Sequence, residues 1–448
     1  MKKISLILIL SFLLLVYLSG QEDYKKYIPL IKRNISENYE GMFKEPGGAF
    51  KYPFITPGSD QYSDVLWDWD SWLTNVALRQ ILKEYGSEKD RENAWKYESG
   101  CILNYLNYGG MNGWIPICIV RSSKPRIPLM EEGGLFRNNM HKPCLAQHAA
   151  FLVRENRGDA EWLREDFYFL QAFVNAYTNH FKHHETGLYF WYNDHSIGVD
   201  NDPATFYRPE MSSGSIYLNC LMYKELLAMV YLANQLDLHE IAEQYQKEAT
   251  MLKISINEYC WDERDGFYYS VDLNLLPYHR PDYWEEMHIG GPRNYPCLIQ
   301  RLDVWSGFLG LWAGLASTDQ AERIVNEHFH DTTRFNAPFG IRTLSPLEKM
   351  YNVRASGNPS SWQGPIWGVS NYLVFSGLVQ YGYYDEAREL AVKTITLFGM
   401  DLEKNGALHE YYLPSNGEPV LNKGFQNWNY LVINMIDWLE DNEYIKEF

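Results

Sequence analysis

The chain has 448 residues, of which 46% are hydrophobic and 22% are charged, and its formal net charge at pH 7 is −17. This composition supports a large hydrophobic core and excludes an intrinsically disordered chain. An acidic chain is also a poor partner for nucleic acid or anionic membranes, because both require a basic surface. A neutral substrate fits better. Aromatic residues make up 16% of the chain, and they serve either a large aromatic core or stacking on the flat faces of sugars.

The N-terminal segment has the features of a secretory signal peptide. Two lysines precede an apolar stretch from Ile4 to Leu18, which ends at the small residues Ser19 and Gly20. The alternative, an uncleaved membrane anchor, would need an apolar run of about 20 residues. We therefore expect residues 1–20 to be removed, and the mature chain to be exported to the periplasm or the extracellular space without a membrane anchor.

The rest of the chain, residues 21–448, shows apolar residues at helical spacing and predicts an all-α fold. Gly, Pro and polar clusters divide this pattern into about twelve helices. The expected helices cover residues 23–40, 68–84, 89–106, 142–156, 159–183, 213–236, 238–259, 301–313, 317–329, 361–381, 383–399 and 424–440. Strands are expected only as short hairpins in loops, around residues 187–192 and 266–271.

The connections between these helices alternate between long and short. The long ones are residues 41–67, 107–141, 184–212, 260–300, 330–360 and 400–423. In a ring of six helical hairpins, successive turns lie at opposite ends, so every long loop would lie on one face, where a site would be built. The alternative is two or three separate helical domains, but no Pro/Ser-rich linker or charge run marks a boundary. The pattern predicts one (α/α)6 barrel over residues 21–448.

The first long loop ends in a cluster of carboxylates and indoles, formed by Trp67, Asp68, Trp69 and Asp70. Such a cluster can bind sugar hydroxyls through its carboxylates while the rings cover the sugar face. The alternative is that an aspartate caps the following helix and the tryptophans belong to the core.

Two other long loops also carry carboxylates. Asp200 and Asp202 lie in the third long loop, and Glu410 lies in the sixth. Cleavage of a glycosidic bond by the usual route needs two carboxyl groups, one protonated to assist the leaving oxygen and one ionised to activate water. Asp-Asn-Asp-Pro is also ordinary turn chemistry, so the residues alone do not decide which carboxylates form a pair.

Four stretches of the chain, taken in order, resemble glycoside hydrolase family 63. This family includes the processing α-glucosidases and the mannosylglycerate and glucosylglycerate hydrolases. The chain also resembles trehalases, more distantly. The stretches are Trp67–Ser71, Gly198–Pro203, Ser361–Trp367 followed by Asn371 and Tyr372, and Glu410–Tyr412 with the downstream Gly417. The resemblance as a whole extends from about residue 45 to residue 430, nearly the whole mature chain.

The resemblance implies an (α/α)6 catalytic barrel and hydrolysis with inversion of a terminal α-linked glucose- or mannose-type sugar, taken from a small glycoside or oligosaccharide. It implies Asp200 as the general acid and Glu410 as the general base. Two departures from the family pattern put contacts in the sugar subsite in doubt. Gln363 stands in place of the usual Arg of a Trp-Arg-Gly-Pro motif, and Ile197 stands where many members have Ser.

Further residues are candidates for binding the substrate, and several have a structural alternative. His141 and Gln147 flank the start of the fourth helix, where Asn138–Pro143 resembles a family segment, but a buried structural histidine is the competing interpretation. Arg208 is equally compatible with a structural ion pair. The full set of binding candidates is Trp67, Asp68, Trp69, Asp70, His141, Gln147, Asn201, Tyr207, Arg208, Trp362, Gln363, Gly364, Trp367 and Tyr411.

No cofactor or metal is expected from the sequence. The six cysteines have neither a CxxC pair nor the spacing of metal ligands, so they are expected to be mostly buried free thiols. Export of the chain would also permit a disulfide bridge.

Two other classes of function compete with a hydrolase. Sugar epimerases and polysaccharide lyases occur on similar helical toroids, and the fold alone does not exclude them. A lyase acting on uronates usually needs a basic cleft, whereas this chain is acidic, and an epimerase is ordinarily cytoplasmic. A non-catalytic glycan-binding protein would explain the aromatic loops but not carboxylates at two family positions.

Overall fold

The computed structural model describes residues 23–109, 112–123, 137–195, 197–275, 295–354 and 359–448. The predicted signal peptide, residues 1–20, lies outside the described residues. Its cleavage and the resulting export therefore stay predictions.

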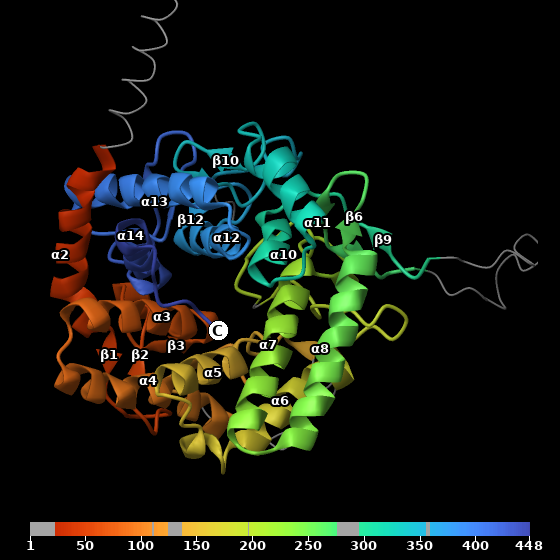
Figure 1. The fold of residues 1–448 in the computed structure, drawn as a ribbon, viewed down its shortest axis with the longest axis horizontal. Coiled ribbons are helices and arrows are strands. Elements are labelled where there is room, and N and C mark those ends of the chain that lie inside the picture. Colours follow the sequence, from red (N-terminus) through yellow and green to blue (C-terminus); the bar gives the residue numbers. More distant parts are fainter. Residues whose placement is uncertain (1–22, 110–111, 124–136, 196, 276–294, 355–358) are drawn as a thin grey trace, which may run out of the picture.

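The inner helical segments of the described chain form a closed ring, which can be followed in Figure 1. Each segment contacts the next, and the last of them, α14, returns to contact the first, α3. The inner segments are α3 (Asp68–Tyr85), α5 (Leu145–Glu155), α7 (Ile216–Gln235), α10 (Leu309–Trp312), α12 (Gly368–Gln380) and α14 (Val432–Asp441). Helix α7 is apolar and long enough to span a membrane by composition, yet 72% of its most apolar window is buried inside the protein. A helix that is surrounded by other parts of the protein is expected to be apolar around its whole circumference.

The other helices alternate with these along the chain and pack outside them (Figure 1). The outer helices are α2 (Ile28–Asn38), α4 (Glu88–Tyr108), α6 (Phe167–His180), α8 (His239–Tyr259), α11 (Thr318–Arg323), which continues as the π-helix η7 (Ile324–Phe329), and α13 (Tyr384–Asn405). The outer helices keep exposed residues, and two of them, α2 and α13, also contact each other. The arrangement confirms the predicted all-α class and the (α/α)6 barrel.

Several predicted helices begin or end at other residues than expected. The fifth expected helix begins only at Phe167, because Glu161–Leu163 forms the separate 3-10 turn η5. The tenth begins at Gly368, because Ile366–Trp367 pairs as strand β12. The eleventh continues to Asn405, where Gly406 ends it with a left-handed φ of 71°. The remaining 3-10 turns are η1 (Asp23–Tyr27), η2 (Tyr39–Met42), η3 (Asp60–Tyr62), η6 (Trp305–Phe308) and η8 (Asn427–Leu431).

In the structure the third long loop extends to Ser215 and the fifth to Trp367, where α7 and α12 begin. Short antiparallel strands occur in the long loops, and several of them pair one loop with another. The first and second loops are joined by β3 (Val65–Trp67) and β4 (Cys118–Val120). The third and fourth are joined by β5 (Ser213–Gly214), β8 (Val271–Asp272) and β9 (Leu298–Ile299). The fifth and sixth are joined by β12 (Ile366–Trp367), β13 (Tyr411–Tyr412) and β14 (Pro419–Val420). These pairings bring the long loops together in pairs at one end of the barrel.

Three local hairpins complete the strands of the described part of the chain. They are β1 (Phe43–Lys44) with β2 (Phe54–Ile55), β6 (Trp261–Asp262) with β7 (Phe267–Tyr268), and β10 (Asn336–Ala337) with β11 (Gly340–Ile341). The β6–β7 hairpin confirms the one expected near residue 266. At the other expected position, Lys182 and Tyr189 form a single antiparallel bridge.

The opposite end of the ring is closed by residues 442–448, and Figure 1 shows the C-terminus near the middle of the ring. Within this segment Glu447 is only 1% exposed. Its carboxylate accepts hydrogen bonds from Trp312 Nε1 at 2.8 Å, Tyr372 Oη at 2.7 Å and Ser376 Oγ at 2.7 Å. Because Ser376 lies in the C-terminal half of α12, this plug sits away from the long loops.

Candidate functional site

The two aspartates at the start of α3 have different environments. Asp68 is buried and forms an ion pair with Lys142, with 2.7 Å between Oδ1 and Nζ. Its carboxylate also accepts backbone N–H bonds from Trp69 at 2.8 Å and Lys142 at 2.9 Å. Both oxygens of Asp68 therefore have protein partners. This is expected if Asp68 stabilises the start of the helix, the alternative to binding a sugar.

Asp70 accepts one hydrogen bond on Oδ1, at 2.5 Å from the side-chain amide of Asn427. Asn427 in turn accepts from Thr74 Oγ1 at 2.9 Å. Burial raises the pKa of Asp70 to about 7, and the charge of Asp68 adds to this effect while Lys142 opposes it. Asp70 is the member of the cluster whose carboxylate is better placed to accept a hydrogen bond from a ligand.

The third long loop packs against this region through its glycine. Gly198 adopts a left-handed φ of 77°, and a Cβ atom there would lie 2.6 Å from Lys142 Nζ. The loop then continues through Asp200, which is partly exposed, to Asp202, which is buried. Asp202 accepts a hydrogen bond from the backbone N–H of Ala204 at 2.9 Å, so this second aspartate stabilises the turn itself.

Asn201 connects the third long loop to the fifth. Its side-chain carbonyl accepts from the backbone N–H of Trp362 at 2.9 Å, and its amide donates to the carbonyl of Ser360 at 3.3 Å. Gln363 donates from Nε2 to the Asn201 carbonyl at 3.2 Å. Gln363, which departs from the family pattern, therefore contacts the backbone of the loop that carries Asp200.

Glu410 is almost completely buried in the sixth long loop, at 4% exposed. Tyr62, from the first long loop, places its hydroxyl 3.4 Å from Oε1 and 3.5 Å from Oε2. The amide of Asn422 donates to Oε2 and also to the Tyr62 hydroxyl, the latter at 3.3 Å. These contacts join the first and sixth loops around one carboxylate.

The charges of two other carboxylates, Asp70 and Asp200, affect the pKa of Glu410. Burial raises the pKa of Glu410 to about 7; the hydrogen bond from Asn422 opposes this, the charges of Asp70 and Asp200 add to it, and the bond from Tyr62 opposes it. Burial and the charges of the same three carboxylates also raise the pKa of Tyr62 well above its usual range. The charges of Asp70 and Asp200 therefore both act on Glu410 and on Tyr62.

Stacked aromatic rings form one wall of this region. Trp362 and Trp367 stack with centroids 4.1 Å apart and planes 10° apart, and Trp367 stacks on Tyr411 at 4.9 Å. Trp69 packs against Trp362 at 6.0 Å and against Trp428 at 5.1 Å. The predicted aromatic residues of the fifth and sixth long loops thus lie in one cluster with Trp69 of α3. Gly364 packs tightly against the ring of Tyr351.

Four further candidates lie outside this cluster of contacts. His141 contacts the Lys142 carbonyl through Nδ1 at 2.6 Å and is buried, which lowers its pKa to about 4. Gln147 is also buried and donates to the carbonyls of Pro143 and Leu221. Arg208 forms an ion pair with Asp272. These contacts support the structural alternatives for His141, Gln147 and Arg208. The fourth candidate, Tyr207, is 84% exposed.

Sequence reasoning did not single out several residues that complete the region. Tyr62, Asn422 and Asn427 contact the carboxylates, Lys142 neutralises Asp68, and Trp428 extends the aromatic wall. Lys142 lies inside the segment that resembled the family, which was a usable signal. The polar partners carry no signal of their own in a single sequence, because Asn and Tyr are ordinary loop residues.

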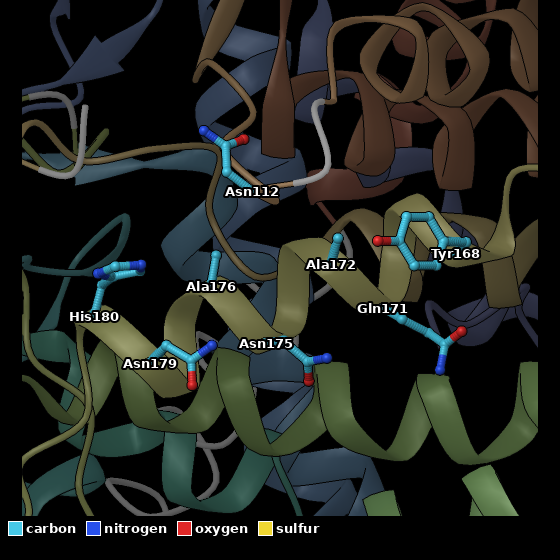
Figure 2. Close-up of a pocket in the computed structure, with 8 residues that line it drawn as sticks. All are labelled: Asn112, Tyr168, Gln171, Ala172, Asn175, Ala176, Asn179 and His180. Carbon is cyan, nitrogen blue, oxygen red and sulfur yellow. The ribbon is translucent and has the colours of Figure 1, made fainter. Parts of the chain in front are cut away.

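A groove on the outer helix α6 is a separate feature, shown in Figure 2. It has a volume of about 390 Å³ and is lined by Asn112, Tyr168, Gln171, Ala172, Asn175, Ala176, Asn179 and His180. None of these residues is a carboxylate, and none belongs to the clustered loops around Glu410. The groove therefore offers no acid–base pair.

The described part of the chain contains the six cysteines and most of the other residues that could bind a metal. All six cysteines lie there as free thiols, and no group of three or more His, Cys, Asp or Glu residues in that part is arranged to hold a metal ion.

Comparison with known proteins places the fold among glycoside hydrolases. The GH63 mannosylglycerate hydrolase from Thermus thermophilus in complex with glucose superposes with a TM-score of 0.63 and 20% identity, covering 91% of this chain and 98% of that chain. The neutral trehalase Nth1 from Saccharomyces cerevisiae gives a TM-score of 0.59 and 17% identity, covering 88% of this chain and 76% of that one. Both likenesses concern the fold.

Sequence similarity to curated proteins is more limited in extent. The cytosolic neutral trehalase of Kluyveromyces lactis is 26% identical over 250 residues, which are 53% of this chain and 30% of the trehalase. The mannosylglycerate hydrolase MGH1 of Selaginella moellendorffii is 30% identical over 115 residues, which are 25% of this chain and 20% of that enzyme. The chain thus spans less than half the length of these relatives.

A family model covers far more of the chain. The mannosylglycerate hydrolase MGH1-like glycoside hydrolase domain matches residues 63–429, an interval that begins beside Tyr62 and ends after Trp428. It includes Asp70, Asp200 and Glu410. This match shows that the chain belongs to the MGH1-like glycoside hydrolases, the family of the mannosylglycerate hydrolases.

Proposed function

We propose that this glycoside hydrolase removes a terminal α-linked glucose- or mannose-type sugar from a small glycoside or oligosaccharide, with inversion at the anomeric carbon. Asp200 acts as the general acid and Glu410 as the general base. The observation that carries the proposal is the chain of contacts between the loops of Asp200 and Glu410. Asn201 binds the backbone N–H of Trp362, and Trp362 stacks through Trp367 on Tyr411, which follows Glu410 in the chain.

The two carboxylates have environments suited to different roles. Glu410 is buried with hydrogen-bond donors from Asn422 and Tyr62 on its oxygens, an arrangement that favours an ionised acceptor. Asp200 lies on a partly exposed loop segment, where it can regain a proton from solvent after each turnover. Because burial raises the pKa of Glu410 to about 7, these environments alone do not assign the acid and the base. The assignment follows the resemblance of Gly198–Pro203 and Glu410–Tyr412 to the acid and base loops of the family.

The reaction follows from this assignment. Asp200 donates its proton to the glycosidic oxygen as the bond to the anomeric carbon breaks, and the aglycone leaves as an alcohol. Glu410 accepts a proton from a water molecule that attacks the same carbon from the opposite face. The products are the free sugar and the alcohol, after which Asp200 takes up a proton and Glu410 releases one.

A sugar also fits the polar groups around the aromatic wall. Within the described residues, the indole N–H groups of Trp191, Trp305 and Trp428 and the hydroxyl of Tyr217 are buried without a hydrogen-bond partner. Tyr217 packs between Trp191 and Trp305, with centroids 6.0 and 6.4 Å away. A buried donor without an acceptor costs free energy, so a ligand with several hydroxyl groups on a flat apolar face is a suitable partner for this cluster.

The substrate class is proposed from the names of the relatives together with the site. Relatives include enzymes named mannosylglycerate hydrolase and neutral trehalase, which points to small glycosides. We expect purified protein to release glucose or mannose from at least one member of a panel containing trehalose, other α-linked disaccharides, mannosylglycerate and glucosylglycerate. Release of an unsaturated product or a C2 epimer, with no free sugar from any panel member, would contradict hydrolysis.

Export of the mature chain is a further part of the proposal. It rests on the basic start, apolar middle and small-residue end of residues 1–20. N-terminal sequencing of the protein recovered outside the cytoplasm should give a sequence beginning near Gln21. A soluble cytoplasmic form that keeps Met1 would contradict this proposal.

A further inference from the structure

The carboxylate of Glu410 is contacted by a residue that neither the sequence motifs nor the family resemblance identified. The side-chain amide of Asn422 donates to Glu410 Oε2, and the same amide lies 3.3 Å from the Tyr62 hydroxyl. Tyr62 in turn approaches Oε1 at 3.4 Å. The two oxygens of one carboxylate are therefore approached by donors from two different loops.

The backbone that carries Asn422 has an unfavourable conformation. Leu421 and Asn422 are consecutive non-glycine residues with left-handed φ angles of 59° and 38°. Residues held in this region cost free energy and persist where the surrounding structure over-determines them. The contacts around this turn, which lies beside the Glu410 carboxylate, must therefore hold the strained conformation.

Backbone hydrogen bonds hold this turn against residues 408–410, which precede strand β13. The N–H of Glu410 donates to the carbonyl of Leu421 at 3.2 Å. On the other side of the turn, the N–H groups of Gly424 and Phe425 both donate to the carbonyl of Leu408, at 2.8 and 3.1 Å. Residues on both sides of Asn422 are thus tied to Glu410 and to Leu408, so the amide and the carboxylate are held in one fixed relation.

An asparagine that merely forms a turn would behave differently. Asparagine tolerates the left-handed region, and in turns its side chain typically bonds its own nearby backbone. The side chain of Asn422 instead reaches two side chains, Glu410 and Tyr62, and Tyr62 belongs to another long loop. The direction of the amide therefore points to a role at the carboxylate rather than in the turn alone.

We propose that Asn422 is a positioning residue for the reaction: its amide fixes the orientation of the Glu410 carboxylate and stabilises its ionised form, so that the opposite lone pair of the base faces the attacking water. This inference rests on the proposed role of Glu410 as general base. A hydrogen bond donated to the charged form of a carboxyl group favours that form, and Glu410 needs such help because its burial disfavours the charge.

Two substitutions remove this interaction and tolerate the left-handed backbone. Asn422→Gly deletes the amide and adopts a positive φ without strain, and Asn422→Asp keeps the size of the side chain but replaces the donor with a second carboxylate. We expect the acidic limb of kcat/KM against pH to move upward by about one to two pH units in Asn422→Gly. The shift should be at least as large in Asn422→Asp, because a like charge lies beside Glu410.

A matched control exists at the other end of the barrel. Asn442 is exposed and also left-handed, with φ 58°, at the C-terminal end of α14. Asn442→Gly makes the same chemical change away from the long loops. We expect its pH profile to be that of the unsubstituted protein, so that any shift at position 422 is specific to the contact with Glu410.

A direct titration separates failure of this inference from failure of the proposed function. In protein labelled with ¹³C at the glutamate carboxyl carbon, the resonance absent from Glu410→Gln reports protonation of Glu410. We expect its midpoint to rise in Asn422→Gly, with thermal unfolding showing a folded protein. An unshifted midpoint and pH profile in both Asn422 variants, while Glu410→Gln is inactive, would overturn the role of Asn422. Near-normal activity of Glu410→Gln would instead overturn the proposed base.

Discussion

Lys142 Nζ lies 2.7 Å from Asp68 Oδ1 in an ion pair whose two side chains are 1% and 0% exposed. Removing one member of a buried pair leaves the other charge uncompensated. We therefore expect Lys142→Met to lower the free energy of unfolding by about 3–5 kcal/mol. Urea denaturation followed by tryptophan fluorescence measures this loss.

The double variant tests whether the loss arises from the pair itself. Asp68→Asn removes the second charge and leaves an oxygen that can accept one of the backbone N–H bonds from Trp69 and Lys142. The combined variant Asp68→Asn/Lys142→Met should lose less stability than the sum of the two single variants, because contacting residues are coupled. Additive losses would show that the ion pair contributes no specific interaction.

The proposed catalytic carboxyls can be tested by substitutions that keep their volume. Asp200→Asn removes the proton donor, and Glu410→Gln removes the proton acceptor. Each should reduce hydrolysis by about 10²–10⁴-fold or more, with a thermal unfolding midpoint close to that of the unsubstituted protein. Turnover near the original rate in a folded variant would refute the role assigned to that residue.

The pH dependence of activity follows from the environment of Glu410. A general base must be ionised, and burial raises the pKa of Glu410 to about 7. The value of kcat/KM should therefore rise with pH through this range and fall as Glu410 becomes protonated below it. A profile that stays flat from pH 5 to pH 8 would argue against a base in this environment.

Asp70→Asn should move this acidic limb in a defined direction. The charge of Asp70 adds to the raised pKa of Glu410, so its removal should shift the limb to lower pH. The variant should also lower kcat/KM at its optimum by about 10- to 100-fold, if Asp70 binds a sugar hydroxyl through a charged hydrogen bond. A shift to higher pH would contradict the electrostatic relationship between the two carboxylates.

Residues 442–448 close the end of the ring away from the long loops, so a substitution there should change stability and leave catalysis unchanged. Glu447→Ala leaves buried donors on Trp312, Tyr372 and Ser376 without their acceptor. We expect a loss of about 2–5 kcal/mol in the free energy of unfolding, and a smaller loss in Glu447→Gln. The kcat of folded protein well below the unfolding temperature should be unchanged in both variants, which activity assays with a titrated amount of folded enzyme can check.

The sequence was informative about the helices because their apolar spacing is a property of the chain itself. The strict alternation of long and short connections was enough to predict the barrel and the end on which the loops lie. Boundaries were less predictable where tertiary pairing competes with helix formation. Ile366 and Trp367 continue an apolar pattern, yet they pair with Tyr412 and Tyr411 as a strand, and no local signal distinguishes the two outcomes.

The candidate site was predictable in its motifs and not in its polar partners. Trp69, Trp362, Trp367 and Tyr411 were identified as a group and lie together in the structure. The contact between Glu410 and Asn422 depends on a left-handed turn, and the approach of Tyr62 depends on how the first and sixth loops pack. Such relations arise only after folding, so a single sequence does not reveal them.

The stereochemistry of the first product tests the central proposal most directly. Proton NMR during the first minutes of hydrolysis, before mutarotation mixes the anomers, reports which anomer is released from an α-linked substrate. If Asp200 protonates the leaving oxygen while Glu410 activates water on the opposite face, the β-anomer must appear first. Initial release of the α-anomer would contradict both the inverting mechanism and the roles of these two carboxyl groups.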